Sequence, residues 1–236
     1  MSAATEQKAF AAAAALELVE SGMTLGLGSG STAEIFVKQL GARLQAGELD
    51  RILAVPTSQG TAEAARAAGV PLIDVDHVVR IDLTVDGADE VDGRFRLIKG
   101  GGACLLREKI IAHASDLMAV VVDESKLVET LGAYPLPVEV DPFAFTITAK
   151  QVFDVLRSCG VARPDVSLRR QADSEKPLIT DGGHYILDCA CTEIPDPEEA
   201  ALALNMIPGV VEHGLFINLA RMVIVGEDGG AQMLEL

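Results

Sequence analysis

Short apolar runs alternate with helix-like segments along the first half of this 236-residue chain. The run 117–122 is apolar at every position, which is typical of a strand buried on both faces. Strands of this kind, interleaved with helices, indicate a mostly parallel sheet covered on both sides, so we expect a Rossmann-like α/β domain. The expected strands are residues 23–27, 51–56, 71–75, 81–85 and 117–122, and the expected helices are residues 5–20, 32–44, 58–68 and 104–114.

The pattern changes after about Leu131, where a group of prolines marks a break. The predicted elements that follow are strand 138–140, helix 149–158, strands 166–170 and 185–190, helix 197–205 and strand 210–212. This β-α-β-β-α-β order is the split unit of ferredoxin-like folds. A last strand, 222–225, is expected to rejoin the first sheet. We therefore predict a Rossmann-like α/β domain of residues 1–131 plus 215–236 and a smaller α+β domain of residues 132–214.

The formal net charge of −16 argues against a nucleic-acid partner, because binding a duplex requires many Lys and Arg side chains. It does not exclude a small anion, since screening limits exposed charges to a range of about 8 Å. No apolar stretch approaches the roughly 20 residues of a membrane span. The four cysteines form no Cys-x-x-Cys pair, which favours reduced thiols and a cytoplasmic location. We expect a soluble protein with neither membrane nor nucleic acid as a partner.

A glycine- and serine-rich loop follows the first expected strand. Residues 26–32 read Gly-Leu-Gly-Ser-Gly-Ser-Thr, directly before an expected helix. Glycines let backbone N–H groups point one way, and Ser29, Ser31 and Thr32 add hydroxyl donors. The helix start adds unpaired N–H groups and the positive end of its dipole. The motif favours phosphate binding, although a tight strand-to-helix turn capped by Ser31 would have the same sequence.

Three carboxylates, Asp86, Asp89 and Glu90, follow the strand 81–85. Ligands of open parallel sheets bind beyond the carboxyl ends of the strands, so these side chains lie where a ligand is expected. Carboxylates this close cannot all ionise freely, and we expect at least one raised pKa. Proton transfer to sugar hydroxyls, a Mg²⁺ site and an Asp-rich turn all fit the motif. The four histidines are scattered without ligand spacing, so we expect no metal.

Residues 99–109 read Lys-Gly-Gly-Gly-Ala-Cys-Leu-Leu-Arg-Glu-Lys. Three glycines before a helix expose backbone N–H groups that can stabilise an oxyanion. On the helical period Glu108 shares a stripe with Cys104, Leu105, Ile111 and Ala112, while Arg107 points away. Glu108 is therefore expected to be partly desolvated, with a raised pKa that suits a general base. The alternative is an edge position with an ordinary ion pair. Lys126, after the strand 117–122, can reach the same edge of the sheet or simply be solvated.

In their order along the chain these motifs resemble the ribose-5-phosphate isomerase A family. The resemblance extends to Val-Asp-Gly-Ala-Asp-Glu at 85–90, Asp-Glu-Ser-Lys at 123–126, Pro-Leu-Pro-Val-Glu-Val at 135–140, Thr-Asp-Gly-Gly at 180–183, Ile-Leu-Asp at 186–188 and Ile-Pro-Gly-Val-Val at 207–211. It covers nearly the whole chain. Cys104 departs from the small alanine expected at its position, and residues 56–60 are less serine-rich than usual.

The resemblance implies a metal-independent, cofactor-free interconversion of D-ribose 5-phosphate and D-ribulose 5-phosphate in the non-oxidative pentose phosphate pathway, by a cytoplasmic homo-oligomer (dimer or tetramer). Glu108 would move a proton between C1 and C2 through a cis-enediol. Asp86 and Asp89 would serve ring opening and hydroxyl contacts, and Lys99 with the amides of residues 100–102 would stabilise the enediolate oxygen. The other substrate-binding residues implied are Ser29, Gly30, Ser31, Thr32, Gly87, Ala88, Gly100, Gly101, Gly102 and Lys126, with Lys8 a further candidate near the phosphate.

Three alternatives remain open at this point. A sugar-phosphate sensor on the same fold would bind without turnover. Such regulators usually carry a DNA-reading helix-turn-helix, and the sheet pattern that begins by Met23 on an acidic chain disfavours this interpretation. An amino-sugar-phosphate deaminase would be expected to use a catalytic histidine, and none adjoins the three motifs; another phosphosugar isomerase is also compatible. A coenzyme A transferase would use a nucleophilic glutamate on an acyl-CoA.

Overall fold

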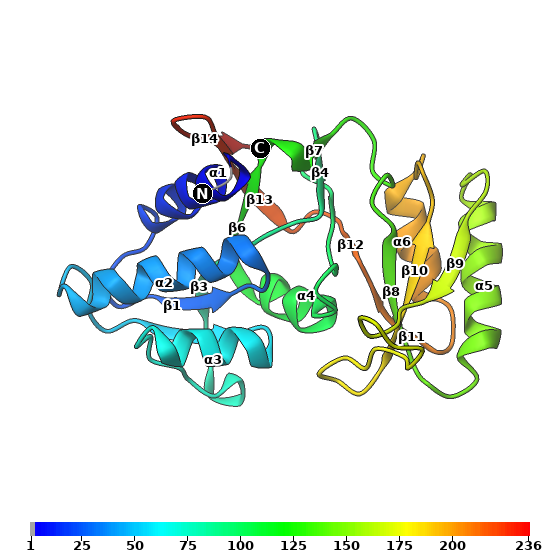
Figure 1. Cartoon of the computed structure of the whole chain (residues 1–236), viewed down its shortest axis with the longest axis horizontal. Helices are drawn as coiled ribbons and strands as arrows, with labels where there is room; N and C mark the ends of the chain where they lie inside the picture. The colour runs from blue at the N-terminus through cyan, green and yellow to red at the C-terminus, as the bar shows by residue number, and fades with distance from the viewer. Residues whose placement is uncertain (1–2) are drawn as a thin grey trace. The chain divides into compact units, whose positions relative to one another are not determined.

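The computed structural model describes residues 3–236 (Figure 1). By its internal contacts the chain divides into two compact units. The first contains the residues up to Ala88, Arg107–Leu127 and Asn218–Leu236, and the second contains Asp89–Leu106 and Val128–Ile217. The chain therefore passes into the second unit twice and returns from it twice.

The first unit is an α/β structure. Its elements are α1 (Ala3–Leu16), β1 (Thr24–Leu27), α2 (Ser31–Gln45), β2 (Leu53–Pro56), α3 (Gln59–Ala67), η1 (Val75–His77), β3 (Ile81–Asp86), most of α4 (Leu105–His113), β6 (Ser115–Asp123), η2 (Glu124–Lys126), β13 (Ala220–Glu227) and β14 (Gly230–Glu235).

Six strands of the described chain form the first sheet, in the order β14-β13-β6-β3-β1-β2. Neighbouring strands are parallel except β13 and β14, which form an antiparallel hairpin. This confirms the predicted Rossmann-like sheet and the return of the run 222–225 to it. From β1 the chain continues to β2 on one side and then to β3 on the other, so the strand order switches between β1 and β3. Ligands of open α/β sheets bind beyond the carboxyl ends of strands at such a point.

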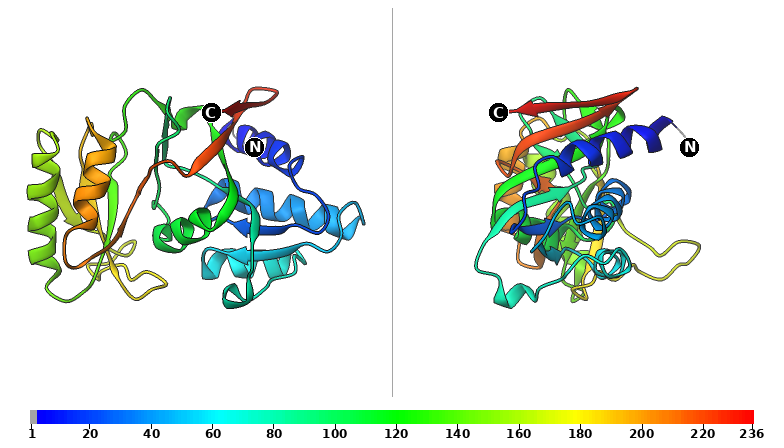
Figure 2. Two further views of the ribbon diagram at one scale, coloured as in Figure 1. Left: turned by 180° about the vertical axis from the view of Figure 1, so that it is seen from behind. Right: turned by 90° about the vertical axis from the view of Figure 1, so that its left-hand side faces the viewer.

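Side chains of the central strands alternate between the two faces of this sheet. Leu25 and Leu27 of β1 pack in one apolar cluster with Phe36 of α2 and the alanines of α1, and Figure 2 shows these two helices along one face. Gly26 faces the other way, where a Cβ atom would lie 2.7 Å from the side chain of Ile111 in α4. Helices therefore cover both faces, as the sequence predicts.

One expected strand is absent from the described residues: 71–75 was predicted as a strand and is not one. Only Leu72 forms an isolated bridge, with Ala54. The cause is Asp74, whose Oδ1 accepts a hydrogen bond from the N–H of Asp76 at 3.1 Å and turns the chain into η1. Conversely, β14 is a strand that was not predicted, because its mostly exposed side chains give no periodic pattern of apolar residues.

The second unit contains α+β structure. Its elements are β4 (Glu90–Asp92), β5 (Leu97–Ile98), β8 (Leu136–Val140), α5 (Phe145–Ser158), β9 (Asp165–Leu168), β10 (Tyr185–Ala190), α6 (Pro197–Asn205), β11 (Val210–His213) and β12 (Leu215–Phe216), and β7 (Leu127–Val128) lies where the chain enters the unit.

The larger sheet of this unit is antiparallel, with the order β11-β8-β10-β9 among the described residues. In chain order these are the fourth, first, third and second strands of a β-α-β-β-α-β unit, which confirms the predicted ferredoxin-like arrangement. Its core joins the buried faces of β8 and β10 to Val152 and Leu156 of α5 and Leu204 of α6.

A smaller sheet, of order β12-β5-β4-β7, was not predicted, because its strands are only two or three residues long. β5 pairs with β12, so residues 89–106 belong with the second unit rather than with the first. We retain the two-domain division as a proposal, with this segment reassigned.

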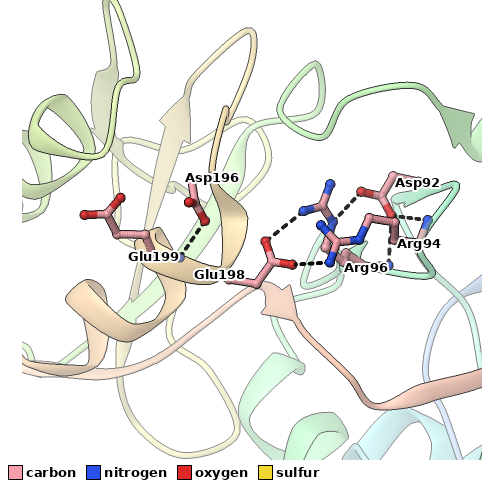
Figure 3. Close-up of polar contacts among 6 residues, drawn as sticks. All are labelled: Asp92, Arg94, Arg96, Asp196, Glu198 and Glu199. Atoms are coloured by element: carbon pink, nitrogen blue, oxygen red, sulfur yellow. Dashed lines mark hydrogen bonds and ion pairs between the residues drawn. The ribbon is translucent and has the colours of Figure 1, made fainter.

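An ionic cluster ties the turn after β4 to the start of α6 (Figure 3). The carboxylate of Asp92 accepts hydrogen bonds from the backbone N–H groups of Arg94 at 2.9 Å and Arg96 at 3.0 Å, and from Nε of Arg96 at 2.6 Å. Nη1 of Arg96 also donates to Glu198 at 2.7 Å. The cluster fixes the short hairpin whose second strand leads directly to Lys99.

Candidate active site

Asp86 lies beneath the loop that follows β1. The N–H of Ser29 donates to its Oδ1 at 3.2 Å, and the N–H of Gly87 donates to the same oxygen at 2.7 Å. A Cβ atom on Gly28 would lie 2.1 Å from Asp86 Oδ1, so only glycine lets the loop pass this close. The carboxylate is fully buried. The carboxyl ends of β1 and β3 therefore meet at the switch in strand order, and Asp86 lies at the carboxyl end of its strand, as predicted.

The loop ends at the beginning of α2. Gly30 has φ +95° and occupies the N-cap position, and no side chain within the described residues caps the helix. The first-turn N–H groups and the positive end of the helix dipole are thus directed at the loop. Glycine is favoured at position 30 because its φ lies in the left-handed region. This is the backbone arrangement of an anion site.

Lys8 of α1 brings a positive charge to this loop. Its Nζ lies 3.0 Å from Oγ of Ser31 and 3.9 Å from Oδ2 of Asp123. α1 can approach β13 closely because position 226 is glycine: a Cβ there would lie 1.8 Å from the backbone oxygen of Gln7. An anion held by the loop would therefore have a cation beside it, despite the acidic composition of the chain.

The hydroxyl of Ser29 is directed into the protein. Its Oγ lies 2.9 Å from Thr57 Oγ1, 2.9 Å from Ser58 Oγ and 3.1 Å from Thr61 Oγ1. Ser58 also caps α3 by accepting a hydrogen bond from the N–H of Thr61. These three residues were not singled out from the sequence, although the Ser-x-x-Thr capping pattern was visible. Ser29 therefore shapes the loop, whereas Gly30 and Ser31 are exposed.

Lys126 lies in η2, just beyond the carboxyl end of β6. Because β6 pairs with β3 in parallel, this end lies at the same edge of the sheet as Asp86. Asp123 turns the chain here, accepting a hydrogen bond from the N–H of Ser125 at 3.1 Å. Lys126 is half-buried. Lys126 therefore lies at the same edge of the sheet as Asp86.

Glu108 lies in the first turn of α4 and is only 4% exposed. Its neighbours on the helical stripe, Leu105, Ile111 and Ala112, are also buried, while Ile110 on the opposite side is 54% exposed. The stripe assigned from the 3.6-residue period is therefore buried from Leu105 onward, whereas Cys104, also assigned to it, precedes α4 and is partly exposed. A carboxylate in this environment is largely removed from water, as its proposed role requires.

Asp89, Lys99 and the glycine turn at 100–102 lie together in the second unit. The N–H of Gly101 donates to Oδ2 of Asp89 at 2.8 Å, and the N–H of Asp89 donates to the carbonyl of Ile98 at 2.8 Å. Lys99 is only 3% exposed, with its Nζ 5.4 Å from the centre of the Phe216 ring. A buried ammonium group over an aromatic face is favourable.

From the sequence we expect the amides of all three glycines to stabilise an oxyanion, but the structure shows that they differ. The Gly101 amide is committed to Asp89, so it holds the turn rather than facing a ligand. Gly100 has φ +107°, which favours glycine at that position. Tyr134 lies close by: burial raises its pKa, the charge of Asp89 adds to the rise, and Arg169 acts against it. Neither Tyr134 nor Arg169 was singled out from the sequence.

Residues 3–236 contain no group of three or more His, Cys, Asp or Glu side chains placed to hold a metal ion. Each helix in this range is too short or too polar to cross a bilayer.

A family model described as ribose 5-phosphate isomerase A (phosphoriboisomerase A) matches residues 53–230. The chain belongs to the ribose 5-phosphate isomerase A family. A relative from Maricaulis maris (strain MCS10), named ribose-5-phosphate isomerase A, is 69% identical over 99% of both chains. Another with the same name, from Parvibaculum lavamentivorans, is 52% identical over 98% of this chain and 99% of its own length.

Solved structures named for the same enzyme have this fold along their whole length. A D-ribose-5-phosphate isomerase in complex with phospho-erythronic acid is 40% identical, with a TM-score of 0.93 and complete coverage of both chains. Ribose 5-phosphate isomerase A from Methanocaldococcus jannaschii is 38% identical, with a TM-score of 0.88 over 98% of each chain. Identity and shape therefore agree on the family.

Proposed function

We propose that Glu108 is the acid/base group of the reaction from which this family takes its name. The chain is an aldose–ketose isomerase that interconverts D-ribose 5-phosphate and D-ribulose 5-phosphate in the non-oxidative pentose phosphate pathway. The residue assignments that follow are our proposal for how it does so.

In the proposed reaction Glu108 removes the proton from C2 of the open-chain aldose. The electron pair forms a C1=C2 double bond, and the carbonyl oxygen on C1 becomes an enediolate oxygen. Lys99 and the N–H groups of Gly100 and Gly102 stabilise that oxygen, an effect typically worth about 10²–10³ in rate for a single donor. Glu108 then returns the proton to C1, the proton of the C2 hydroxyl passes to the enediolate oxygen on C1, and C2 becomes the carbonyl carbon of the ketose.

Asp86 and Asp89 are assigned to ring opening and to hydroxyl contacts. The rigid hold of Asp86 by two backbone N–H groups supports this, because a fixed carboxylate can orient a hydroxyl. The phosphate is assigned to the loop at residues 29–32, with Lys8 beside it. The remaining residues proposed to contact substrate are Gly87, Ala88 and Lys126, and Gly101 is proposed to act indirectly, by holding the turn through Asp89.

The observation that carries this proposal is the burial of Glu108 at the start of a helix that follows three glycines. The test is Glu108→Gln, which keeps the size of the side chain and removes its basicity. Base catalysis contributes about 10²–10⁴ in rate, so turnover should fall by at least that factor. Proton NMR of ribose 5-phosphate in D₂O measures ketose formation and deuterium exchange at C1 and C2 together.

The matched control is Glu63→Gln, the same change at an exposed position of α3. It should leave turnover unchanged. Glu108→Gln should keep the wild-type melting temperature and still bind phospho-erythronic acid. Turnover in Glu108→Gln close to that of wild type would overturn the assignment.

We further propose that the enzyme requires neither metal nor cofactor, is a homodimer or homotetramer, and is cytoplasmic. Exposed apolar side chains on the second unit, including Phe143, Ile147 and Met206, support self-association. Size-exclusion chromatography coupled to light scattering measures the number of subunits. A monomer at micromolar concentration contradicts the proposed homo-oligomer. Activity should be complete in EDTA, and a loss restored by added metal contradicts metal independence.

A further inference from the structure

Two carbonyl groups of the glycine turn are bound by one arginine. Nη1 of Arg169 donates to the carbonyl oxygen of Gly100 at 2.8 Å and to that of Gly101 at 3.0 Å. Arg169 follows β9 directly, far from the glycines in sequence but in the same compact unit. Its side chain is only 13% exposed.

These two hydrogen bonds fix two peptide planes. In a trans peptide the C=O and the next N–H point in opposite directions, and the described chain has no cis peptide bond. A Gly100 carbonyl directed at Arg169 therefore directs the Gly101 N–H away from it, and that N–H is found on Asp89 at 2.8 Å. By the same geometry the Gly101 carbonyl directs the Gly102 N–H away from Arg169. The arginine thus sets the direction in which the amides of the turn point.

The guanidinium is itself held in orientation by Asp188 of β10. The Nε of Arg169 donates to Asp188 Oδ2 at 2.9 Å and Nη2 donates to Oδ1 at 2.5 Å, a bidentate pair. The backbone of Arg169 is also fixed: its N–H donates to Ile186 at 2.8 Å and its carbonyl accepts from Leu178 at 2.9 Å. The ferredoxin-like sheet therefore supplies a rigid support for the glycine turn.

We propose that Arg169, oriented by Asp188, is a positioning residue for isomerisation: it holds the Gly100–Gly101 and Gly101–Gly102 peptides so that the Gly102 amide faces the reacting oxygen. This inference rests on the proposed function of the turn. Arg169 makes no contact with substrate in this account. Its removal therefore affects the transition state more than substrate binding, because the enediolate charge develops only during the reaction.

The test compares Arg169→Ala with Arg170→Ala. Arg170 is the adjacent residue with the same charge, but its side chain is half-exposed and paired with Glu175. In Arg169→Ala we expect kcat to fall by about 10- to 100-fold, which is less than the rate loss caused by removing an oxyanion donor itself. KM should change by less than about threefold. Arg170→Ala should behave as wild type.

Millimolar guanidinium ion provides the second readout. It should restore part of kcat in Arg169→Ala and have no effect on wild type or Arg170→Ala, because only the first variant lacks a guanidinium at the turn. A purely stabilising ion pair would lower the melting temperature without this rescue. Asp188→Asn should give a smaller loss of kcat than Arg169→Ala, since the arginine is still present but less well oriented.

A folded Arg169→Ala variant with kcat within about threefold of wild type overturns the inference. If Arg169→Ala does not fold, Arg169→Lys is the test variant. Lysine keeps the positive charge but lacks the guanidinium that binds both carbonyl groups, so an unchanged kcat in the folded lysine variant also overturns the inference. A failure of the proposed function can be distinguished from a failure of this inference. If the proposed function is wrong, Glu108→Gln retains turnover regardless of the result for the Arg169 variants.

Discussion

The carboxylate of Asp86 accepts the backbone N–H of Ser29 at 3.2 Å, although 57 positions separate the two residues. The contact exists because Gly28 lacks a side chain at the point where the β1 loop passes over β3. It joins the proposed phosphate loop to a proposed ring-opening carboxylate, so displacement of one should disturb the other.

Gly28→Ala should therefore reduce both stability and activity. The added Cβ would meet Asp86 Oδ1 at 2.1 Å, and overpacking of this kind costs about 1–3 kcal/mol. We expect kcat/KM to fall at least about tenfold in steady-state kinetics. Urea unfolding of the same preparation measures the loss of stability. Gly93→Ala is the control, because a Cβ there meets nothing within 4 Å. Wild-type kinetics in Gly28→Ala would contradict the proposed coupling of loop and carboxylate.

Lys8→Met should weaken substrate binding more than the chemical step. The lysine lies beside Ser31 at the proposed phosphate loop, so its charge should act equally on substrate and transition state. We expect KM for ribose 5-phosphate to rise about tenfold, with kcat within about threefold of wild type. Lys38→Met makes the same change at an exposed site of α2. Equal effects of the two variants would show that only net charge matters.

Arg96→Ala should destabilise the protein strongly. It would leave the carboxylate of Asp92, only 1% exposed, without its charged partner, and breaking a buried pair costs about 3–5 kcal/mol. Arg94→Ala removes a 72% exposed arginine from the same turn and should cost less than about 1 kcal/mol. Urea unfolding of both variants measures the difference. Similar losses would indicate that the turn, rather than the pair, carries the stability.

Iodoacetamide should modify Cys104 before the other cysteines. Burial raises the pKa of Cys191 to about 12, and burial also raises the pKa values of Cys159 and Cys189. The thiolate is the reactive form, so near pH 8 only about 1 in 10⁴ Cys191 thiols is reactive, and the fraction rises tenfold per pH unit.

Cys104 is the partly exposed cysteine of the four. Mass spectrometry after limited labelling should find the adduct there, and at all four positions after unfolding in urea. Native labelling of Cys189 or Cys191 at the rate of Cys104 would contradict the burial.

The parts of the candidate site that depend on the order of strands and helices along the chain, or on the period of one helix, could be predicted from the sequence. Ser31, Asp86 and Lys126 each follow a strand of one parallel sheet, so their meeting at one edge follows from topology alone. Glu108 was placed by the 3.6-residue period of its own helix. These inferences needed no knowledge of distant contacts.

The sequence did not predict what depends on long-range pairing. Arg169 looks like any arginine at the end of a strand, and nothing local shows that it meets Gly100. The inward turn of the Ser29 hydroxyl depends on Thr57, which directly follows β2, and on Thr61 of α3. The expected strand 71–75 failed because the hydrogen bond that Asp74 accepts outweighs the strand propensity of its apolar neighbours.

The position of β13 between β6 and β14 has a consequence for biosynthesis. A ribosome must reach β13 (Ala220–Glu227) before β6 can gain its second neighbour, whereas the last strand of the ferredoxin-like sheet is synthesised by His213. The later-finished sheet exposes an apolar edge to the cell in the meantime, where it can pair with other chains. Nascent copies that stall before Ala220 should therefore depend on chaperones far more than the completed polypeptide does.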